Sequence, residues 1–179
     1  MVLNVNDIEK NIICFCQVKI NIYHIKLKIR SKFMKEIIIA SGNKGKIRET
    51  QEILNEYKII SMNELGIDID VEEDKNTFEG NAIKKAQTIA KKIGGKMCIA
   101  DDSGIEIEFL DGFPGVLTKR WHDGTDRERN LAIIEKLKSV PKEKRKITFT
   151  TAIALSNGET TICETGTIDG FVAEKPTRR

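Results

Sequence analysis

The chain has 179 residues, 40% of them hydrophobic and 32% charged, and a formal net charge of +3. Such a chain is typical of one globular domain with a sizeable core, and it has no apolar run of the roughly 18 residues that span a bilayer, so we expect no membrane partner. Residues 1–33 hold six Lys and Arg against two acids and contribute +4, which leaves −1 for the remainder. That balance lacks the basic footprint of a nucleic-acid-binding domain, so we expect no nucleic-acid partner either.

The four cysteines indicate the cellular setting. Cys14, Cys16, Cys98 and Cys163 are scattered, and the first two are too close together to form a metal site alone. This spacing matches neither a disulfide framework nor a zinc site. We therefore expect reduced thiols and a cytoplasmic protein.

Residues 1–33 differ from the rest of the chain in composition. They are rich in Ile, Lys and Asn, and they lack the small-residue cleavage site of a secretory signal. The stretch that follows from Met34 reads like a natural protein start. This favours an extension at 1–33 and a domain at 34–179; a genuine edge strand or a membrane-surface segment is the alternative.

From Met34 on, strand patterns and helix patterns alternate, which predicts an α/β protein. Capping boxes at 76–79 and 125–128 each predict the start of a helix, and Gly94-Gly95 predicts the end of the first one. The expected strands are 36–40, 58–61, 67–71, 96–101, 105–110, 147–155 and 160–168, with a hairpin turn at 156–159. The expected helix faces are Ile47, Ile53 and Leu54 in 44–57, then Phe78, Ala82, Ala86, Ile89 and Ala90, and finally Leu131, Ile134 and Leu137.

The stretch "SGNKGK" (Ser41–Lys46) joins a buried strand to the start of a helix. Such a loop presents free backbone N–H groups and the positive end of a helix dipole, and a phosphate chain is the natural ligand. The spacing does not fit a Walker A loop. A glycine-rich turn with solvent-facing lysines is an equally good local interpretation.

The stretch "ADDSG" places two adjacent acids after a buried strand. In open α/β folds, ligands bind at the carboxyl edge of the sheet, and unpaired carboxylates there need a cation or a donor. Because successive strand residues point to opposite faces, Asp101 and Asp102 are expected to have different roles. A strand-to-strand turn with purely local hydrogen bonds is the alternative. A further acidic segment, Asp70–Asp74, matters for a metal only if Glu72 or Glu73 points toward Asp102.

Four motifs occur together in one order: "SGNKGK", "EED" followed by "NTFEGNAIKKA", "ADDSGIEI" and "GFPGVLTKRW". With them, residues 34–179 resemble the house-cleaning nucleoside triphosphate pyrophosphatases that act on inosine and xanthosine triphosphates. The resemblance implies an elongated, two-lobed α/β fold with a mixed central sheet flanked by helices and a nucleotide cleft between the lobes. It also implies a homodimer that takes a purine nucleoside triphosphate as substrate.

The resemblance implies a role for each matching position. Asp102 would be the general base and a Mg²⁺ ligand, Glu72 would be the second acid at the metal, and Ser103 would contact the substrate. The triphosphate would be cradled by Ser41, Gly42, Asn43, Lys44, Gly45 and Lys46. Water activated by Asp102 would attack the α-phosphorus and yield the monophosphate and pyrophosphate.

The sequence departs from the family pattern in three places. Gly80 stands where the family has Glu before the Asn of its "TFxENA" helix, and only Arg120 is kept from the family's "SAR". The chain also stops before the "GFGYDP" segment and the later Ser-His-Arg that grip the purine base, so we expect a C-terminal truncation. A non-catalytic nucleotide- or phosphate-binding remnant and a pyrophosphatase with relaxed base selectivity are therefore the alternatives.

Overall fold

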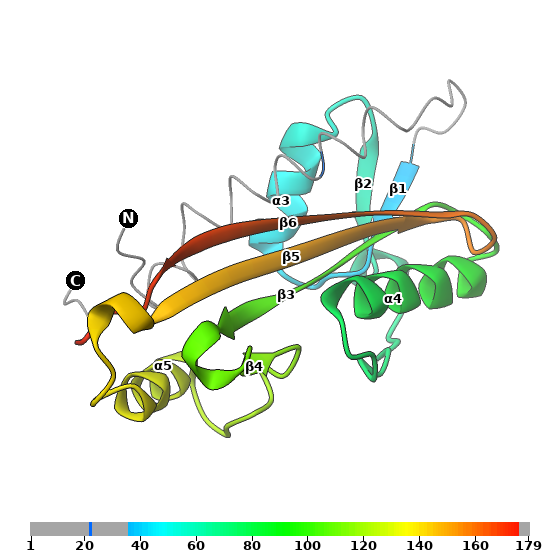
Figure 1. The fold of residues 1–179 in the computed structure, drawn as a ribbon. Coiled ribbons are helices and arrows are strands. Elements are labelled where there is room, and N and C mark those ends of the chain that lie inside the picture. Colours follow the sequence, from blue (N-terminus) through cyan, green and yellow to red (C-terminus); the bar gives the residue numbers. More distant parts are fainter. Residues whose placement is uncertain (1–21, 23–35, 176–179) are drawn as a thin grey trace. The chain divides into compact units, whose positions relative to one another are not determined.

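The computed structural model describes Ile22 and residues 36–175 (Figure 1). Its sheet contains both parallel and antiparallel pairs, in the strand order β2-β1-β3-β5-β6, with β4 pairing β3. The strands are β1 (Glu36–Ile39), β2 (Lys58–Ser61), β3 (Cys98–Ile107), β4 (Pro114–Gly115), β5 (Lys146–Ser156) and β6 (Thr161–Phe171). The helices are α3 (Lys44–Ile53), α4 (Phe78–Lys92) and α5 (Asp126–Lys136), with short 3-10 turns between elements. The expected α/β fold with a mixed sheet is confirmed.

The chain divides into two compact units. The α3/α4 unit contains Ile22 and residues 36–102 and 151–166, and the α5 unit contains residues 103–150 and 167–175. No helix in the described part of the chain is long and apolar enough to cross a membrane.

In the α3/α4 unit, alternate side chains of β1 pack against α3 on one face of the strand and against α4 on the other. Ile37 and Ile39 belong to the apolar cluster that contains Ile53 of α3, whereas Ile38 packs with Ile89 of α4. Because successive strand residues face opposite ways, a fully apolar β1 requires a helix on each face. All five apolar positions expected on the second predicted helix are buried in α4.

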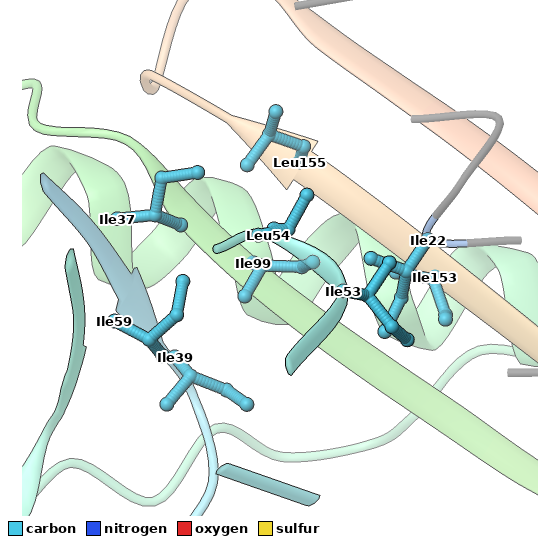
Figure 2. Close-up of a cluster of buried hydrophobic side chains, with 9 residues drawn as sticks. All are labelled: Ile22, Ile37, Ile39, Ile53, Leu54, Ile59, Ile99, Ile153 and Leu155. Atoms are coloured by element: carbon cyan, nitrogen blue, oxygen red, sulfur yellow. The ribbon is translucent and has the colours of Figure 1, made fainter. Parts of the chain in front are cut away.

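Ile22 also belongs to the core of this unit. It is 1% exposed and lies beside Ile53 and Ile153 in the cluster drawn in Figure 2. This residue therefore contributes to packing, although it precedes Met34. The remainder of the expected extension at 1–33 lies outside the described residues, so its assignment stays a prediction.

The α5 unit packs one face of α5 against β3 and β5. Ile133 and Leu137 are buried there with Ile107, while Asn130 is the buried residue one turn earlier. The expectation for Leu131 was wrong, since this side chain is 40% exposed. The buried stripe follows the spacing 130, 133, 137, and a helix turns 100° per residue, so position 131 falls beside the stripe.

Several expected elements differ from the structure, and the helix expected over 44–57 ends at Ile53. Residues 96–101 and 105–110 were expected to be two strands around a turn, but β3 runs without a break from Cys98 to Ile107. The expected strand at 67–71 is not regular structure. Helix α4 begins after Thr77, whose Oγ1 accepts from the Gly80 N–H at 3.0 Å. The capping box expected at 76–79 is therefore wrong, because the N-cap lies one residue later than expected. The second, at Thr125 and Glu128, is confirmed.

The hairpin expected at 156–159 is also confirmed. It joins the long strands β5 and β6, which run side by side in Figure 1. Ser156 Oγ accepts from the Gly158 N–H at 3.0 Å, and Asn157 Oδ1 accepts from the Thr160 N–H at 2.7 Å. These side chains satisfy backbone donors that the turn leaves without strand partners.

Candidate phosphate and metal site

Asp101 and Asp102 lie in β3, just beyond the carboxyl end of β1. Ile39, the last residue of β1, is in register with Ile99, and the segment Ser41–Lys46 after β1 holds a short loop and the first residues of α3. The parallel β1–β3 pair therefore brings this segment, which we call the β1 loop, to the level of the two acids. Both motifs therefore lie at the carboxyl edge of the parallel strands β1 and β3.

The two acids bind different helices. The Asp101 carboxylate forms an ion pair with Lys46 Nζ at the start of α3. Asp102 Oδ2 accepts a hydrogen bond from Asn81 Nδ2 of α4 at 2.9 Å. Since α3 and α4 cover opposite faces of the strands, the alternation of β3 places one carboxylate on each face. The acids thus belong to a continuous strand and do not form a turn.

Nearby positive charge compensates the Asp101 carboxylate. Burial alone raises the pKa of Asp101, but the charge and hydrogen bond of Lys46, with the charge of Lys85, outweigh burial and hold that pKa below its usual value. The Lys46 side chain remains 39% exposed, against 18% for Asp101. Lys46 is therefore held beside Asp101 while its side chain remains partly open to solvent.

The β1 loop is organised by Asn43, the N-cap of α3. Its Oδ1 accepts from the N–H groups of Gly45 at 2.8 Å and Lys46 at 3.4 Å, and its own N–H donates to Ser41 Oγ at 3.2 Å. The expectation that these N–H groups stand free was wrong for Gly45 and Lys46, because an asparagine at the N-cap uses its side chain to bind the first donors of the helix. Gly42, Asn43 and Lys44 are exposed.

The acidic segment Asp70–Asp74 reaches the site through Glu73. Lys85 Nζ of α4 binds Glu73 Oε1 at 2.6 Å and donates to the Asp101 backbone carbonyl at 3.3 Å. Glu72 is exposed. Asp74 pairs with Lys84 Nζ at 2.9 Å, and that hydrogen bond lowers the pKa of Asp74. Of the two glutamates considered from the sequence, the structure brings Glu73 toward the acids.

Asn81 and Lys85 were missed as site residues in the sequence. They are four positions apart and therefore share one face of α4, the face that carries the contacts to Asp102 and to the Asp101 carbonyl. The available signal was this spacing within "GNAIKK". It was obscured because the neighbouring Ala82, Ala86 and Ile89 define the buried face of the helix so clearly.

A magnesium ion would find suitable donors here. Asp102, and the acidic segment beside it, offer carboxylate oxygens, and Mg²⁺ is usually held by one or two carboxylates together with substrate phosphates. Within the described residues, no group of three or more His, Cys, Asp or Glu side chains is arranged to hold a metal ion. The donor chemistry thus fits an ion that shares its ligands with a substrate. Ser103, the next residue of β3, is half-buried and belongs to the α5 unit.

Comparison with known proteins gives one consistent result. The model of the Ham1 family matches residues 37–179. The dITP/XTP pyrophosphatase of Bacillus subtilis is 43% identical over 148 residues, which cover 80% of this chain and 74% of the relative. The dITP/XTP pyrophosphatase of Clostridium perfringens is 41% identical over 152 residues, which cover 79% of this chain and 74% of that relative.

Solved structures agree with these relatives. The Ham1 protein of Staphylococcus aureus matches with a TM-score of 0.72 at 38% identity, over 78% of this chain and 73% of the other. A HAM1 protein from Coxiella burnetii matches with a TM-score of 0.73 at 36% identity, over 80% and 76%.

Proposed function

Because the chain belongs to the Ham1 family, we propose that it hydrolyses non-standard purine nucleoside triphosphates, namely those of inosine, deoxyinosine and xanthosine. The products are the nucleoside monophosphate and pyrophosphate. Two relatives at 41% and 43% identity are named dITP/XTP pyrophosphatases. The observation that carries the proposal is the placement of Asp102 and Lys46 around the edge where β1 ends. We propose further that the protein is a cytoplasmic homodimer.

In this reaction, Asp102 is the general base. Its carboxylate orients a water molecule, whose oxygen forms a bond to the α-phosphorus while the bond from that phosphorus to the bridging oxygen breaks. Pyrophosphate leaves with the bonding electron pair, and the proton of the water passes to Asp102. A base acts in this way when its carboxylate is ionised and fixed in orientation, and the Asn81 hydrogen bond supplies the second condition.

The cationic side chains bind the substrate. The Lys46 side chain is 39% exposed, so a triphosphate can reach it in its place beside Asp101. Lys85 is less exposed, at 19%, and holds Glu73 near the acids. Catalysis of phosphoryl transfer depends mainly on positioning and charge stabilisation, which such fixed charges provide.

Magnesium is the proposed cofactor. Asp102 and Glu72 are its proposed ligands, and Glu73 is a second candidate for the latter position because it points toward the acids. When bound, Mg²⁺ neutralises phosphate charge and orients the phosphates for in-line attack. Ser41, Gly42, Asn43, Lys44, Gly45, Lys46 and Ser103 are the proposed substrate-binding residues.

The test is pyrophosphate release from the inosine, deoxyinosine and xanthosine triphosphates, with ATP and GTP for comparison, each with and without Mg²⁺. We expect release from the first three that depends on the metal and is abolished by Asp102→Asn. The matched control is Asp68→Asn, a change at an exposed aspartate of the same unit, which should leave activity intact. Binding without release would favour the non-catalytic remnant, and equal release from ATP and GTP would favour relaxed base selectivity.

A further inference from the structure

Asn81 joins two separate segments of the α3/α4 unit. Its Oδ1 accepts a hydrogen bond from the backbone N–H of Lys75 at 2.9 Å, and its Nδ2 donates to Asp102 Oδ2, also at 2.9 Å. The residue is 1% exposed. Burial of a side-chain amide costs little free energy when both of its ends have hydrogen-bond partners, whereas loss of either partner leaves a buried polar group unsatisfied.

Chemistry fixes the direction of this bridge. A backbone N–H can only donate, so the Asn81 atom that faces Lys75 must be the carbonyl oxygen. The NH₂ group must then face Asp102, whose ionised carboxylate can only accept. The hydrogen bond is charge-assisted and directional, and it fixes the orientation of the Asp102 carboxylate plane.

The same face of α4 holds the acidic segment at a second point. Lys85, one turn after Asn81, binds Glu73 at 2.6 Å. Residues 73 and 75 are therefore both tied to α4, one through an ion pair and one through a backbone hydrogen bond. The segment between them is held in register with Asp102 by contacts that all start from a single rigid helix.

We propose that Asn81 is a positioning residue, which orients the Asp102 carboxylate for attack on the substrate and keeps the acidic segment beside it. This role rests on the proposed function of Asp102. Asn81 is buried, so it acts through Asp102 and Lys75 rather than by contact with the nucleotide. Its loss should therefore lower kcat while leaving KM little changed.

Two variants separate the two ends of the bridge. Asn81→Asp keeps an acceptor for the Lys75 N–H but replaces the donor to Asp102, and Asn81→Ala removes both contacts. We expect kcat for inosine triphosphate to fall roughly 10–100-fold in both variants, the usual effect of removing an outer-shell partner. Gln87→Ala is the matched control, because Gln87 is an amide of the same helix that donates to Thr161 Oγ1 at 3.0 Å, and its kcat should stay at the wild-type value.

Hydrogen exchange of the Lys75 backbone amide detects its hydrogen bond to Asn81 independently of enzymatic activity. This amide should be protected in the wild type and in Asn81→Asp, and it should exchange faster in Asn81→Ala. The side-chain NH₂ signals of Asn81 should shift in Asp102→Ala, since that change removes their acceptor.

Several results would overturn the proposal. These are an unchanged kcat in both variants, a raised KM with intact kcat, or a loss of activity that disappears when the assay is run well below the unfolding temperature of the variant. An unprotected Lys75 amide in the wild type would show that the bridge does not form. If the wild-type chain hydrolyses none of the triphosphates but its Lys75 amide is protected from exchange, the proposed function is wrong. The Asn81 bridge would then be present but would have no catalytic role.

Discussion

Lys46 forms an ion pair with Asp101, and this contact joins the start of α3 to the middle of β3. Lys46 is one of the residues proposed to bind the triphosphate, and Asp101 is the neighbour of the proposed base. In the proposed complex, the Asp101 carboxylate would therefore compete with the substrate phosphate for the Lys46 ammonium group.

Lys46→Met should weaken substrate binding more than Lys44→Met. The Lys44 side chain starts from an exposed position of the β1 loop, whereas Lys46 is already held beside the acids. A hydrogen bond to a charged group contributes about 1.5–3 kcal/mol, so KM for inosine triphosphate should rise about 10- to 100-fold in Lys46→Met. Steady-state kinetics of the two variants measures this difference, and equal effects would contradict the placement of Lys46.

Asp101→Asn should reduce the free energy of unfolding. The change removes the charged partner of Lys46, but Lys46 is partly exposed, so water can solvate its ammonium group. We therefore expect the free energy of unfolding to fall by about 1–2 kcal/mol, between the values typical of surface and of buried ion pairs. Urea unfolding at pH 7 measures it. Glu36→Gln is the control, because it breaks the exposed Lys58–Glu36 pair and should cost only about 0–1 kcal/mol.

The contribution of the Lys46–Asp101 ion pair to stability depends on pH. The folded pKa of Asp101 is lowered, so the stability it contributes is present above the unfolded pKa of about 3.9 and is lost as the pH falls through the folded pKa. The difference in unfolding free energy between wild type and Asp101→Asn should therefore be constant from pH 7 to about 5 and shrink in stronger acid. Urea titrations across this range test it; a difference that shrinks already near neutral pH would contradict the direction of the shift.

Ile22→Ala should destabilise the protein although position 22 lies outside the residues matched by the family model. Removing a fully buried isoleucine leaves a cavity and typically costs about 2–5 kcal/mol. A chain that begins at Met34 should lose at least as much. The control is Leu65→Ala, at a side chain 41% exposed in the same unit. Equal stability of the shortened chain would instead support a dispensable extension at 1–33.

Gly80→Ala should destabilise α4 despite the higher helix propensity of alanine. A Cβ at position 80 would lie 2.9 Å from Lys75 Cβ and 3.0 Å from Thr77 Oγ1. Overpacking of this kind costs about 1–3 kcal/mol, against a gain of at most about 1 kcal/mol from propensity, so we expect a net loss of stability. Thermal unfolding checks the sign. Since Lys75 makes two of the three short contacts and Thr77 the third, the double change Gly80→Ala with Lys75→Gly should recover part of the loss.

Local signals in the sequence were sufficient for some elements and misleading for others. Helix α4 was predicted with all its buried apolar positions because apolar spacing and a glycine stop agree within one short stretch. The pattern at 67–71 alternates like a strand, yet Ile69 and Val71 pack into the cluster around α4 without joining a strand. Alternation reports which side chains are buried, and it does not report whether the backbone has a pairing partner.

The acids illustrate a second limit of the sequence. Asp101 and Asp102 suggested a break in the strand because two charges are costly inside a sheet. The strand continues because Lys46 and Asn81, 55 and 21 residues away in the chain, compensate one carboxylate each. Lys46 was expected as a phosphate ligand and not as the partner of Asp101, and Asn81 was not expected near the acids, because contacts between residues so far apart leave no periodic trace in the sequence.

The Asn43 cap also has a thermodynamic consequence. The carboxamide oxygen of Asn43 already occupies the N–H groups of Gly45 and Lys46. An anion that takes these donors must displace that oxygen and give up the capping free energy, typically about 1 kcal/mol. The Asn43 side chain therefore competes with any anion for these two N–H groups. The more strongly Asn43 caps α3, the lower the affinity of the two groups for a phosphate.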